Sequence, residues 1–274
     1  MDRFIEPALR ARIQAELDAI EREETVKILL AVESGSRAWG FPSRDSDYDV
    51  RFLYVRPIES YLAVTLPRDV IERPVDAVLD VNGWDLRKAL QLMLRSNAVL
   101  IEWLTSPVRY RDWCQANDLL ALARSAASLT ALTYHYQHQA RRSFDAVSGG
   151  GETARLKSYC YALRSALAIA WIRQRGEAPP MDVETLMAGV SLPEELVEQF
   201  HQVIAQKMAA TEEESMPRSA TFDALIADAI SAPASEAAAP PGKEISIQAD
   251  AFLAALLLNR TDTAGVSKGG STCS

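Results

Sequence analysis

The sequence has few cysteines and no long apolar run. Its three cysteines, Cys114, Cys160 and Cys273, are far apart and odd in number, which favours reduced thiols over a disulfide framework. No apolar run approaches the ~18–20 residues that cross a bilayer. The N-terminus, MDRFIEPALRAR, is charged throughout and lacks the apolar core of a signal peptide. These absences predict a cytoplasmic protein that makes no membrane contact.

Several signatures of known enzyme and binding classes are missing as well. The sequence contains no nucleophile-elbow pattern, Walker loop or dinucleotide fingerprint. The net charge of −8 disfavours a dedicated nucleic-acid binder, whose phosphate contacts need clustered Lys and Arg. The charge is uneven, however, because residues 141–175 hold seven basic residues against two acidic ones, whereas residues 177–236 hold twelve acidic residues against two basic ones. The acidic segment is typical of solvated helix faces, and the basic segment is either such a face or a surface for RNA.

Hydrophobic residues make up 48% of the 274 positions and charged residues 24%, which is ordinary for one large or two small globular domains. Apolar periodicity predicts the N-terminal elements: a helix over 7–24, strands over 26–33, 48–55 and 75–82, and a helix after Gly83. From about residue 113 to 230 the pattern is helical, with no convincing strand. This order predicts an α+β fold, in which a mixed sheet with helices is followed by a helical domain.

The predicted domain boundaries follow from these patterns and from composition. The α+β domain covers residues 1–110 and the helical domain residues 111–231. The Pro/Ala-rich stretch 232–244 is predicted to be a flexible linker. Residues 245–274 are predicted to form a short helix and a disordered tail rich in Gly, Ser and Thr.

The stretch that carries chemistry is GSRAWGFPSRDSDYDVRF, residues 35–52. Asp47 and Asp49 are two apart at the start of a predicted strand, so both side chains point to the same side of the sheet. A divalent cation between two such carboxylates removes their repulsion, and Mg²⁺ suits the role because it also binds substrate phosphates. Gly35 lets backbone N–H groups approach phosphate oxygens, and Ser36 adds a hydroxyl donor. The combination predicts a metal-dependent site for a phosphorylated substrate.

These residues resemble the signature of the DNA polymerase β nucleotidyltransferase superfamily, which is Gly-Ser, a spacer and then Asp-x-Asp. Together with LDVNGWDLRKAL and SNAVLIEWL, they look like its RNA-repair-pathway branch. The resemblance covers roughly residues 25–230. It implies that residues 1–110 form the catalytic nucleotidyltransferase domain and that the helical domain binds nucleotide and substrate.

The resemblance also implies a third metal-ligating carboxylate on a neighbouring strand. Asp76 and Asp80 share a strand face by parity, so either can be that ligand. Asp80 is favoured because LDVNGWDLRK matches the family pattern. Asp85 precedes a helical stripe and is predicted to be an N-cap. Lys157 is the candidate in the basic segment for contacting the triphosphate from the helical half.

The implied reaction is a two-metal in-line displacement at the α-phosphorus of a nucleoside triphosphate such as ATP. Mg²⁺ or Mn²⁺ would be held by Asp47, Asp49 and Asp80, while Gly35 and Ser36 cradle the β- and γ-phosphates. The acceptor is open between an RNA end, which the basic segment favours, a small molecule such as an aminoglycoside, and a protein side chain. A regulatory module without catalysis is disfavoured, because a degenerate site has no reason to keep two repelling carboxylates. The preferred base and the oligomeric state stay open.

Overall fold

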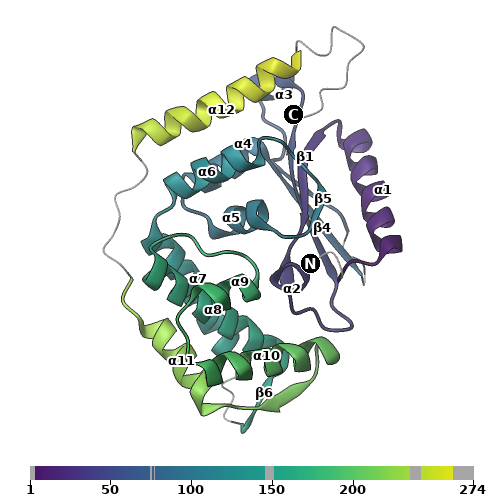
Figure 1. The fold of residues 1–274 in the computed structure, drawn as a ribbon. Helices are drawn as coiled ribbons and strands as arrows, with labels where there is room; N and C mark the ends of the chain where they lie inside the picture. Colours follow the sequence, from purple (N-terminus) through teal and green to yellow (C-terminus); the bar gives the residue numbers. More distant parts are fainter. Residues whose placement is uncertain (1–3, 75, 77, 146–150, 235–241, 262–274) are drawn as a thin grey trace.

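The computed structural model describes residues 4–74, 76, 78–145, 151–234 and 242–261. A five-stranded mixed sheet with helices on both faces is joined to a helical half (Figure 1). This is the α+β arrangement that the sequence predicts. Within the described residues, no helix combines the length and the hydropathy that crossing a membrane requires.

The sheet places two distant segments of the sequence side by side. Its strands are β1 (Lys27–Glu33), β2 (Tyr48–Val55), β3 (Val70–Glu72), β4 (Leu79–Asp85) and β5 (Arg109–Arg111), in the order β3-β4-β2-β1-β5. From β2 the chain passes through the short helix α3 (Ile58–Leu62) to β3, and then turns back into β4. β4 therefore lies between β3 and β2 and runs parallel to β2, whereas the other neighbouring strands are antiparallel.

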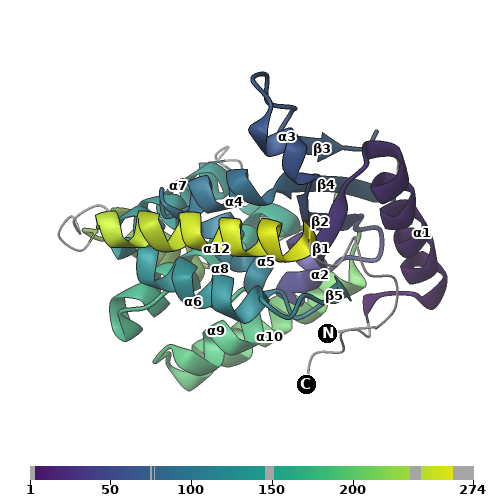
Figure 2. The same ribbon diagram turned by 90° about the horizontal axis from the view of Figure 1, so that it is seen from above.

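One face of the sheet is covered by α1 (Pro7–Glu24), which Figure 2 shows on the side opposite the other helices. Ile13, Leu17 and Ile20 form the stripe of this helix that is fully buried. They belong to the same apolar cluster as Val50 and Phe52, which alternate along β2. The helix has the predicted bounds, because its apolar spacing and a proline at its start are local signals.

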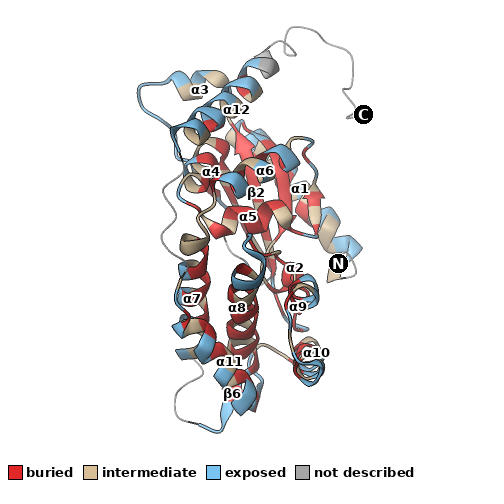
Figure 3. Ribbon diagram, turned by 60° about the vertical axis from the view of Figure 1, so that its left-hand side comes forward, coloured by how far each residue is buried: buried red, intermediate tan, exposed pale blue. Residues whose placement is uncertain are grey.

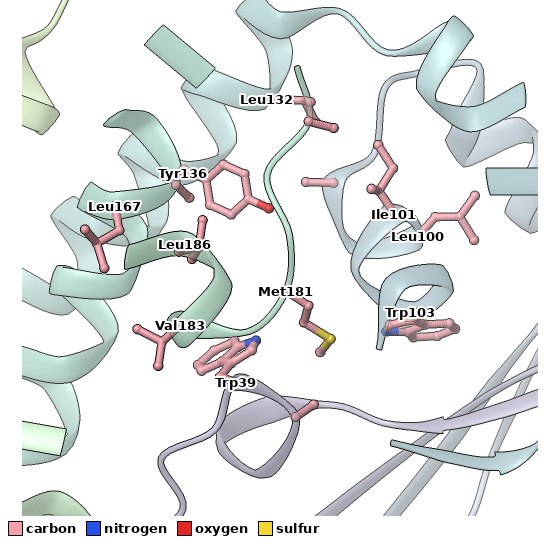
Figure 4. Close-up of a cluster of buried hydrophobic side chains, with 14 of the residues drawn as sticks. Trp39, Leu100, Ile101, Trp103, Leu132, Tyr136, Leu167, Met181, Val183 and Leu186 are labelled. Atoms are coloured by element: carbon pink, nitrogen blue, oxygen red, sulfur yellow. The ribbon is translucent and has the colours of Figure 1, made fainter. Parts of the chain in front are cut away.

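The opposite face carries α4 (Leu86–Met93) and α5 (Ala98–Thr105), and its apolar core continues without a break into the helical half. Figure 3 shows buried residues running from the sheet along the inner sides of the long helices. Figure 4 shows Trp39 and Trp103 from the N-terminal half facing Tyr136, Met181 and Leu186 from the helical half. The two halves therefore share one core.

The helical half is built around the packed pair α7 (Leu129–Asp145) and α8 (Leu156–Arg175). The other helices are α6 (Ala116–Ala126), α9 (Val183–Gly189), α10 (Glu194–Ala209) and α11 (Ala220–Ser231). Contrary to the prediction, this half also contains strands: β6 (Thr153–Arg155) pairs with β7 (Ser215–Pro217). Each has three residues, which is too short to show an alternating pattern.

The C-terminal helix α12 (Lys243–Thr261) begins two residues before the predicted helix and packs on α6 and α4 (Figure 2). Its Phe252 makes an edge-to-face contact with Trp113, with ring centroids 5.9 Å apart. Most of the predicted linker and the predicted tail lie outside the described residues.

The predicted strand over 75–82 is observed as β4, which begins four residues later and ends three residues later. The Asp76 side chain accepts hydrogen bonds from the backbone N–H groups of Val78 and Leu79, both at 2.7 Å. This local turn ends just where β4 begins, because a short Asp side chain competes with strand pairing for backbone donors. Positions 75 and 77 lie outside the described residues. Asp85 caps α4 as predicted, since its side chain accepts from the N–H of Arg87.

A buried ion pair joins the two halves. Arg164 of α8 donates to Glu102 of α5 at 2.9 Å, and their side chains are 1% and 7% exposed. The guanidinium also donates to the Met181 carbonyl and lies 4.4 Å from the centre of the Trp39 ring, while Tyr136 donates to Glu102 at 3.1 Å. Arg164, a member of the basic segment, is therefore enclosed by the core and does not face RNA.

Glu102→Ala should leave the Arg164 guanidinium buried without its counter-charge. We expect the free energy of unfolding, measured by chemical denaturation, to fall by about 3–5 kcal/mol. The control is Glu213→Ala, which removes the partner of Arg155 in an exposed pair and should leave stability nearly unchanged. Equal effects of the two substitutions would show that the buried pair does not hold the halves together.

Candidate active site

The predicted Gly-Ser turn connects β1 to the short helix α2 (Gly35–Trp39). Gly35 has a φ of 58°, in the left-handed region that favours glycine. A Cβ placed on Gly35 would lie 2.1 Å from Oδ2 of Asp49. The N–H of Ser34 also donates to the Asp49 carbonyl at 2.8 Å. The turn and the second aspartate of Asp-x-Asp are therefore packed directly against each other, as only glycine permits.

Two of the predicted carboxylates lie side by side on parallel strands. Asp49 of β2 is paired in register with Asp80 of β4, and Asp47 is exposed immediately before β2. Burial raises the pKa of Asp49, and the neighbouring carboxylates of Asp47 and Asp80 raise it further, while Arg51 and Lys157 act in the opposite direction. The three carboxylates thus interact electrostatically at one end of the sheet.

Asp76, the alternative third carboxylate, lies elsewhere. Besides forming its local turn, its side chain makes an exposed ion pair with Arg12 of α1. Of the two candidates left open by strand parity, the fold brings Asp80 to Asp49.

The guanidinium of Arg51 stands between Asp49 and Asp80. Its Nη2 donates to Oδ1 of Asp49 at 2.8 Å and to Oδ2 of Asp80 at 2.7 Å. Among the described residues, no three His, Cys, Asp or Glu side chains are gathered as a ready metal site. Two carboxylate oxygens nevertheless converge on one positively charged nitrogen, with a third carboxylate exposed nearby. Such a set of hard oxygen donors fits Mg²⁺ or Mn²⁺, provided that the guanidinium moves aside.

A second arginine fixes the segment before β2. Arg37 of α2 donates to the carbonyl of Asp47 at 3.0 Å and to that of Ser46 at 2.6 Å. Its guanidinium lies 3.7 Å from the centre of the Tyr48 ring and donates to the Phe4 carbonyl at 2.8 Å. These contacts determine the direction in which the Asp47 side chain leaves the backbone.

Glu33, the last residue of β1, supports Asp49 from behind. Its side chain is fully buried, accepts the N–H of Asp49 at 2.9 Å and accepts the hydroxyl of Tyr110. Burial raises the pKa of Glu33 to about 8, against the lowering effect of these two hydrogen bonds. Glu33 therefore holds the backbone of Asp49 through its carboxyl group.

The helical half contributes Lys157 from the first turn of α8. Its Nζ donates to Glu212 at 2.6 Å, and its charge lowers the pKa of Asp49. Glu212 lies in the loop between α10 and β7 and also accepts from Ser46 at 3.4 Å. Lys157 is thus close enough to interact electrostatically with Asp49, and in the free protein it is paired with an acid of its own half.

Ser36 belongs to a cluster of buried hydroxyls. Its Oγ donates to Oγ of Ser46 at 3.2 Å, and Ser46 Oγ lies 2.9 Å from Oγ of Ser43. Lys207 of α10 donates to Ser43 Oγ at 2.7 Å. Burial lowers the pKa of Lys207, although Glu212 and Asp45 raise it. The Gly35 turn is therefore connected to the helical half.

The fold brings together the predicted residues Gly35, Ser36, Asp49, Asp80 and Lys157, with Asp47 beside them. Sequence analysis missed the supporting residues Arg37, Arg51, Glu33, Lys207 and Glu212. Two of these had a local signal, because Arg37 directly follows Gly-Ser and Arg51 lies two residues after Asp49 on the same strand face. The others come from positions with no pattern of their own.

Comparisons with known proteins extend across almost the whole described fold. A family model described as "RNA repair pathway DNA polymerase beta family" (RlaP) matches residues 9–255. That range begins in α1 and includes much of α12, so it is wider than the resemblance to residues 25–230. The uncharacterized protein YcgL of Bacillus subtilis (strain 168) is 44% identical over 205 residues, covering 74% of this chain and 78% of that protein.

Among solved structures, a nucleotidyltransferase-like protein from Exiguobacterium sibiricum 255-15 aligns with 79% of this chain and 75% of its own. The identity is 12% and the TM-score 0.28. A TM-score of that size does not establish a shared arrangement of elements.

Gly35→Ala should displace the Asp49 carboxylate, because the new Cβ would overlap Oδ2. We expect Mn²⁺ binding, followed by electron paramagnetic resonance, to be lost or severely weakened. The matched control is Gly176→Ala. Gly176 has a φ of 67° with nothing within 4 Å of the added Cβ, so the control carries a similar backbone strain of about 1–2 kcal/mol without the overlap. Unchanged Mn²⁺ binding in Gly35→Ala would contradict the assignment of this turn to the site.

Proposed function

Because this chain belongs to the RNA repair pathway DNA polymerase beta family, and is therefore a nucleotidyltransferase, we propose that it transfers a nucleoside monophosphate from a nucleoside triphosphate to a hydroxyl at an RNA end. The observation that carries the proposal is the pairing of Asp49 with Asp80, where Asp49 packs against the Gly35 turn and Lys157 of the helical half acts electrostatically on Asp49. This arrangement would provide acidic metal ligands and a basic phosphate contact within one site.

The turn and Lys157 would bind the triphosphate. Backbone N–H groups at Gly35 and the hydroxyl of Ser36 are suited to the β- and γ-phosphates. Lys157 would exchange Glu212 for phosphate oxygens, so that its charge faces the negative charge that grows on the departing pyrophosphate. Because the binding groups come from both halves, their shared core keeps them in a fixed relation before substrate arrives.

The three carboxylates Asp47, Asp49 and Asp80 would hold Mg²⁺ or Mn²⁺. When bound, the metal would stabilise the charge on the attacking and leaving oxygens. Asp80 lies on the side away from the Gly35 turn and would serve the acceptor hydroxyl. That hydroxyl would lose its proton to water as its oxygen bonds to the α-phosphorus, while the bond from that phosphorus to the bridging oxygen breaks and pyrophosphate leaves.

An RNA acceptor is supported by the family match and by the end of α7. Within the basic segment, Arg164 is buried and Arg155 and Arg173 are paired with acids. Arg141 and Arg142 are exposed in the last turns of α7, near the start of α8 that carries Lys157. Their exposure supports the proposal that Arg141 and Arg142 contact RNA phosphates.

A small cationic acceptor is the second candidate. Asp45 is exposed beside the site and accepts the backbone N–H of Glu212 at 3.0 Å. Acids lining an acceptor cleft are expected in enzymes that modify polycationic molecules such as aminoglycosides. The acceptor assay below separates this alternative from RNA.

Asp49→Ala and Asp80→Asn should each reduce turnover by roughly a thousandfold, equivalent to about 4 kcal/mol of transition-state stabilisation. Asp80→Asn should alter nucleotide affinity much less, since Asp80 serves the acceptor side. Asp76→Asn is the matched control and should be mild, because Asp76 pairs with Arg12 instead. A larger loss in Asp76→Asn than in Asp80→Asn, measured as steady-state turnover, would overturn the assignment.

The acceptor is tested by incubating the protein with each labelled nucleoside triphosphate, Mg²⁺, and cellular RNA, protein or metabolites. We expect label at RNA ends. Arg141→Ala/Arg142→Ala should weaken RNA binding and flatten its dependence on salt, because fewer counterions are released. Triphosphate affinity should stay nearly unchanged in this variant. Label on metabolites or proteins, with none on RNA, would refute the RNA acceptor while leaving nucleotidyl transfer intact.

A further inference from the structure

Lys207 is a fully buried lysine whose hydrogen-bond partner, Ser43, carries no charge. Lysines are almost never fully buried without a charged partner, because removing an ammonium group from water is costly. Lys207 lies near the end of α10, and its Nζ reaches the segment that links the Gly35 turn to Asp47. A lysine buried at that cost beside the Gly35 turn indicates that its ammonium group acts on this turn.

Three hydrogen-bond donors approach the Oγ of Ser46, which is more than this oxygen can accept. Ser46 Oγ is approached by the N–H of Ser43 at 3.0 Å, by Oγ of Ser43 at 2.9 Å and by Oγ of Ser36 at 3.2 Å. A hydroxyl oxygen has two lone pairs, so it accepts two hydrogen bonds well. Which of the three donors is excluded depends on the direction of the Ser43 hydroxyl hydrogen.

Lys207 sets that direction. An ammonium group can only donate, so Ser43 Oγ accepts from Lys207 and turns its own hydrogen toward Ser46. Ser46 then directs its hydrogen to Glu212, at 3.4 Å. Both lone pairs of Ser46 are filled by Ser43, and Ser36, the most distant donor, is left without a strong acceptor. We infer that Lys207 is a positioning residue that keeps the Ser36 hydroxyl free to bind a phosphate of the nucleoside triphosphate.

This inference rests on the proposed function. It predicts that two different substitutions act on the Ser36 hydroxyl in the same way. In Lys207→Met, Ser46 can donate to Ser43, and the lone pair thus freed accepts the Ser36 hydroxyl. In Ser43→Ala, a competing donor is removed and Ser36 again becomes fixed to Ser46. Both changes therefore withdraw the Ser36 hydroxyl from the phosphate by the same route.

Affinity is measured by calorimetry with the α,β-methylene analogues of ATP, GTP, CTP and UTP in Mg²⁺. Lys207→Met and Ser43→Ala should each weaken binding by about tenfold, the scale of one hydrogen bond to a charged group. The double variant should be no weaker than either single variant. In a Ser36→Ala background both substitutions should lose their effect, because the group that they control is absent. In turnover assays KM for the triphosphate should rise more than kcat falls.

Arg155→Ala is the control for the loss of a positive charge near α8, and it should leave affinity unchanged. Thermal melting reports whether each variant is folded, and Ser43→Ala carries the test if Lys207→Met does not fold. The role of Lys207 would be refuted if Lys207→Met and Ser43→Ala weakened affinity equally in the Ser36→Ala background, or if they caused no loss in the wild-type background. Either result would leave the proposed function intact. If the wild-type protein bound none of the four analogues, the proposed function would fail and this inference with it.

Discussion

The repulsion between Asp49 and Asp80 is the constraint on which the rest of the site depends. Parallel pairing of β2 and β4 sets the two carboxylates in register, and the charge of Asp80 adds to the effect of burial in raising the pKa of Asp49. The protein sustains this arrangement with positive charge, since Arg51 bridges both carboxylates. It also requires glycine at position 35, because the Asp49 carboxylate occupies the space of a side chain.

The parallel pairing itself depends on how the chain returns to the sheet. β4 is not reached directly from β2, because α3 and the edge strand β3 come first, and β4 is then inserted between β3 and β2. The helical half is held to this sheet by a common core and by the buried ion pair between Arg164 and Glu102. Breaking such a pair is strongly unfavourable, whatever the net value of forming it. The shared core and this ion pair therefore fix the position of Lys157 relative to the carboxylates.

The parts of this fold that sequence predicts are those with local signals. α1 and β2 have their predicted bounds and β1 differs by one residue, because apolar periodicity and a terminal proline or glycine mark them. The third strand was placed too early, because the Asp76 side chain forms a turn with Val78 and Leu79 that periodicity does not reveal. The three-residue strands β3, β5, β6 and β7 carry no periodic signal and form through tertiary pairing.

The same distinction holds for the site. Gly35, Ser36, Asp47 and Asp49 form a spaced motif, and Asp80 follows from strand parity together with a family resemblance; their catalytic roles stay predictions. Lys207 and Glu212 are 164 and 166 residues from their partners Ser43 and Ser46. They lie in a segment whose acidic composition indicates only solvated helix faces. Their importance depends on the way α10 and its following loop fold back onto the segment before β2, which local patterns do not encode.

In the free protein, four of the side chains suited to binding substrate already have partners within the chain. Asp49 and Asp80 have Arg51, Lys157 has Glu212, and Ser36 has its weak contact with Ser46. Substrate binding at this site would therefore be an exchange of partners, in which only the difference between the new and the old interactions contributes to affinity. The exchange is least costly at Ser36, whose present acceptor is shared with two other donors. Pairing these four side chains reduces the unbalanced charge of the empty site, and it favours ligands that replace all of these contacts together, as a metal-bound triphosphate would.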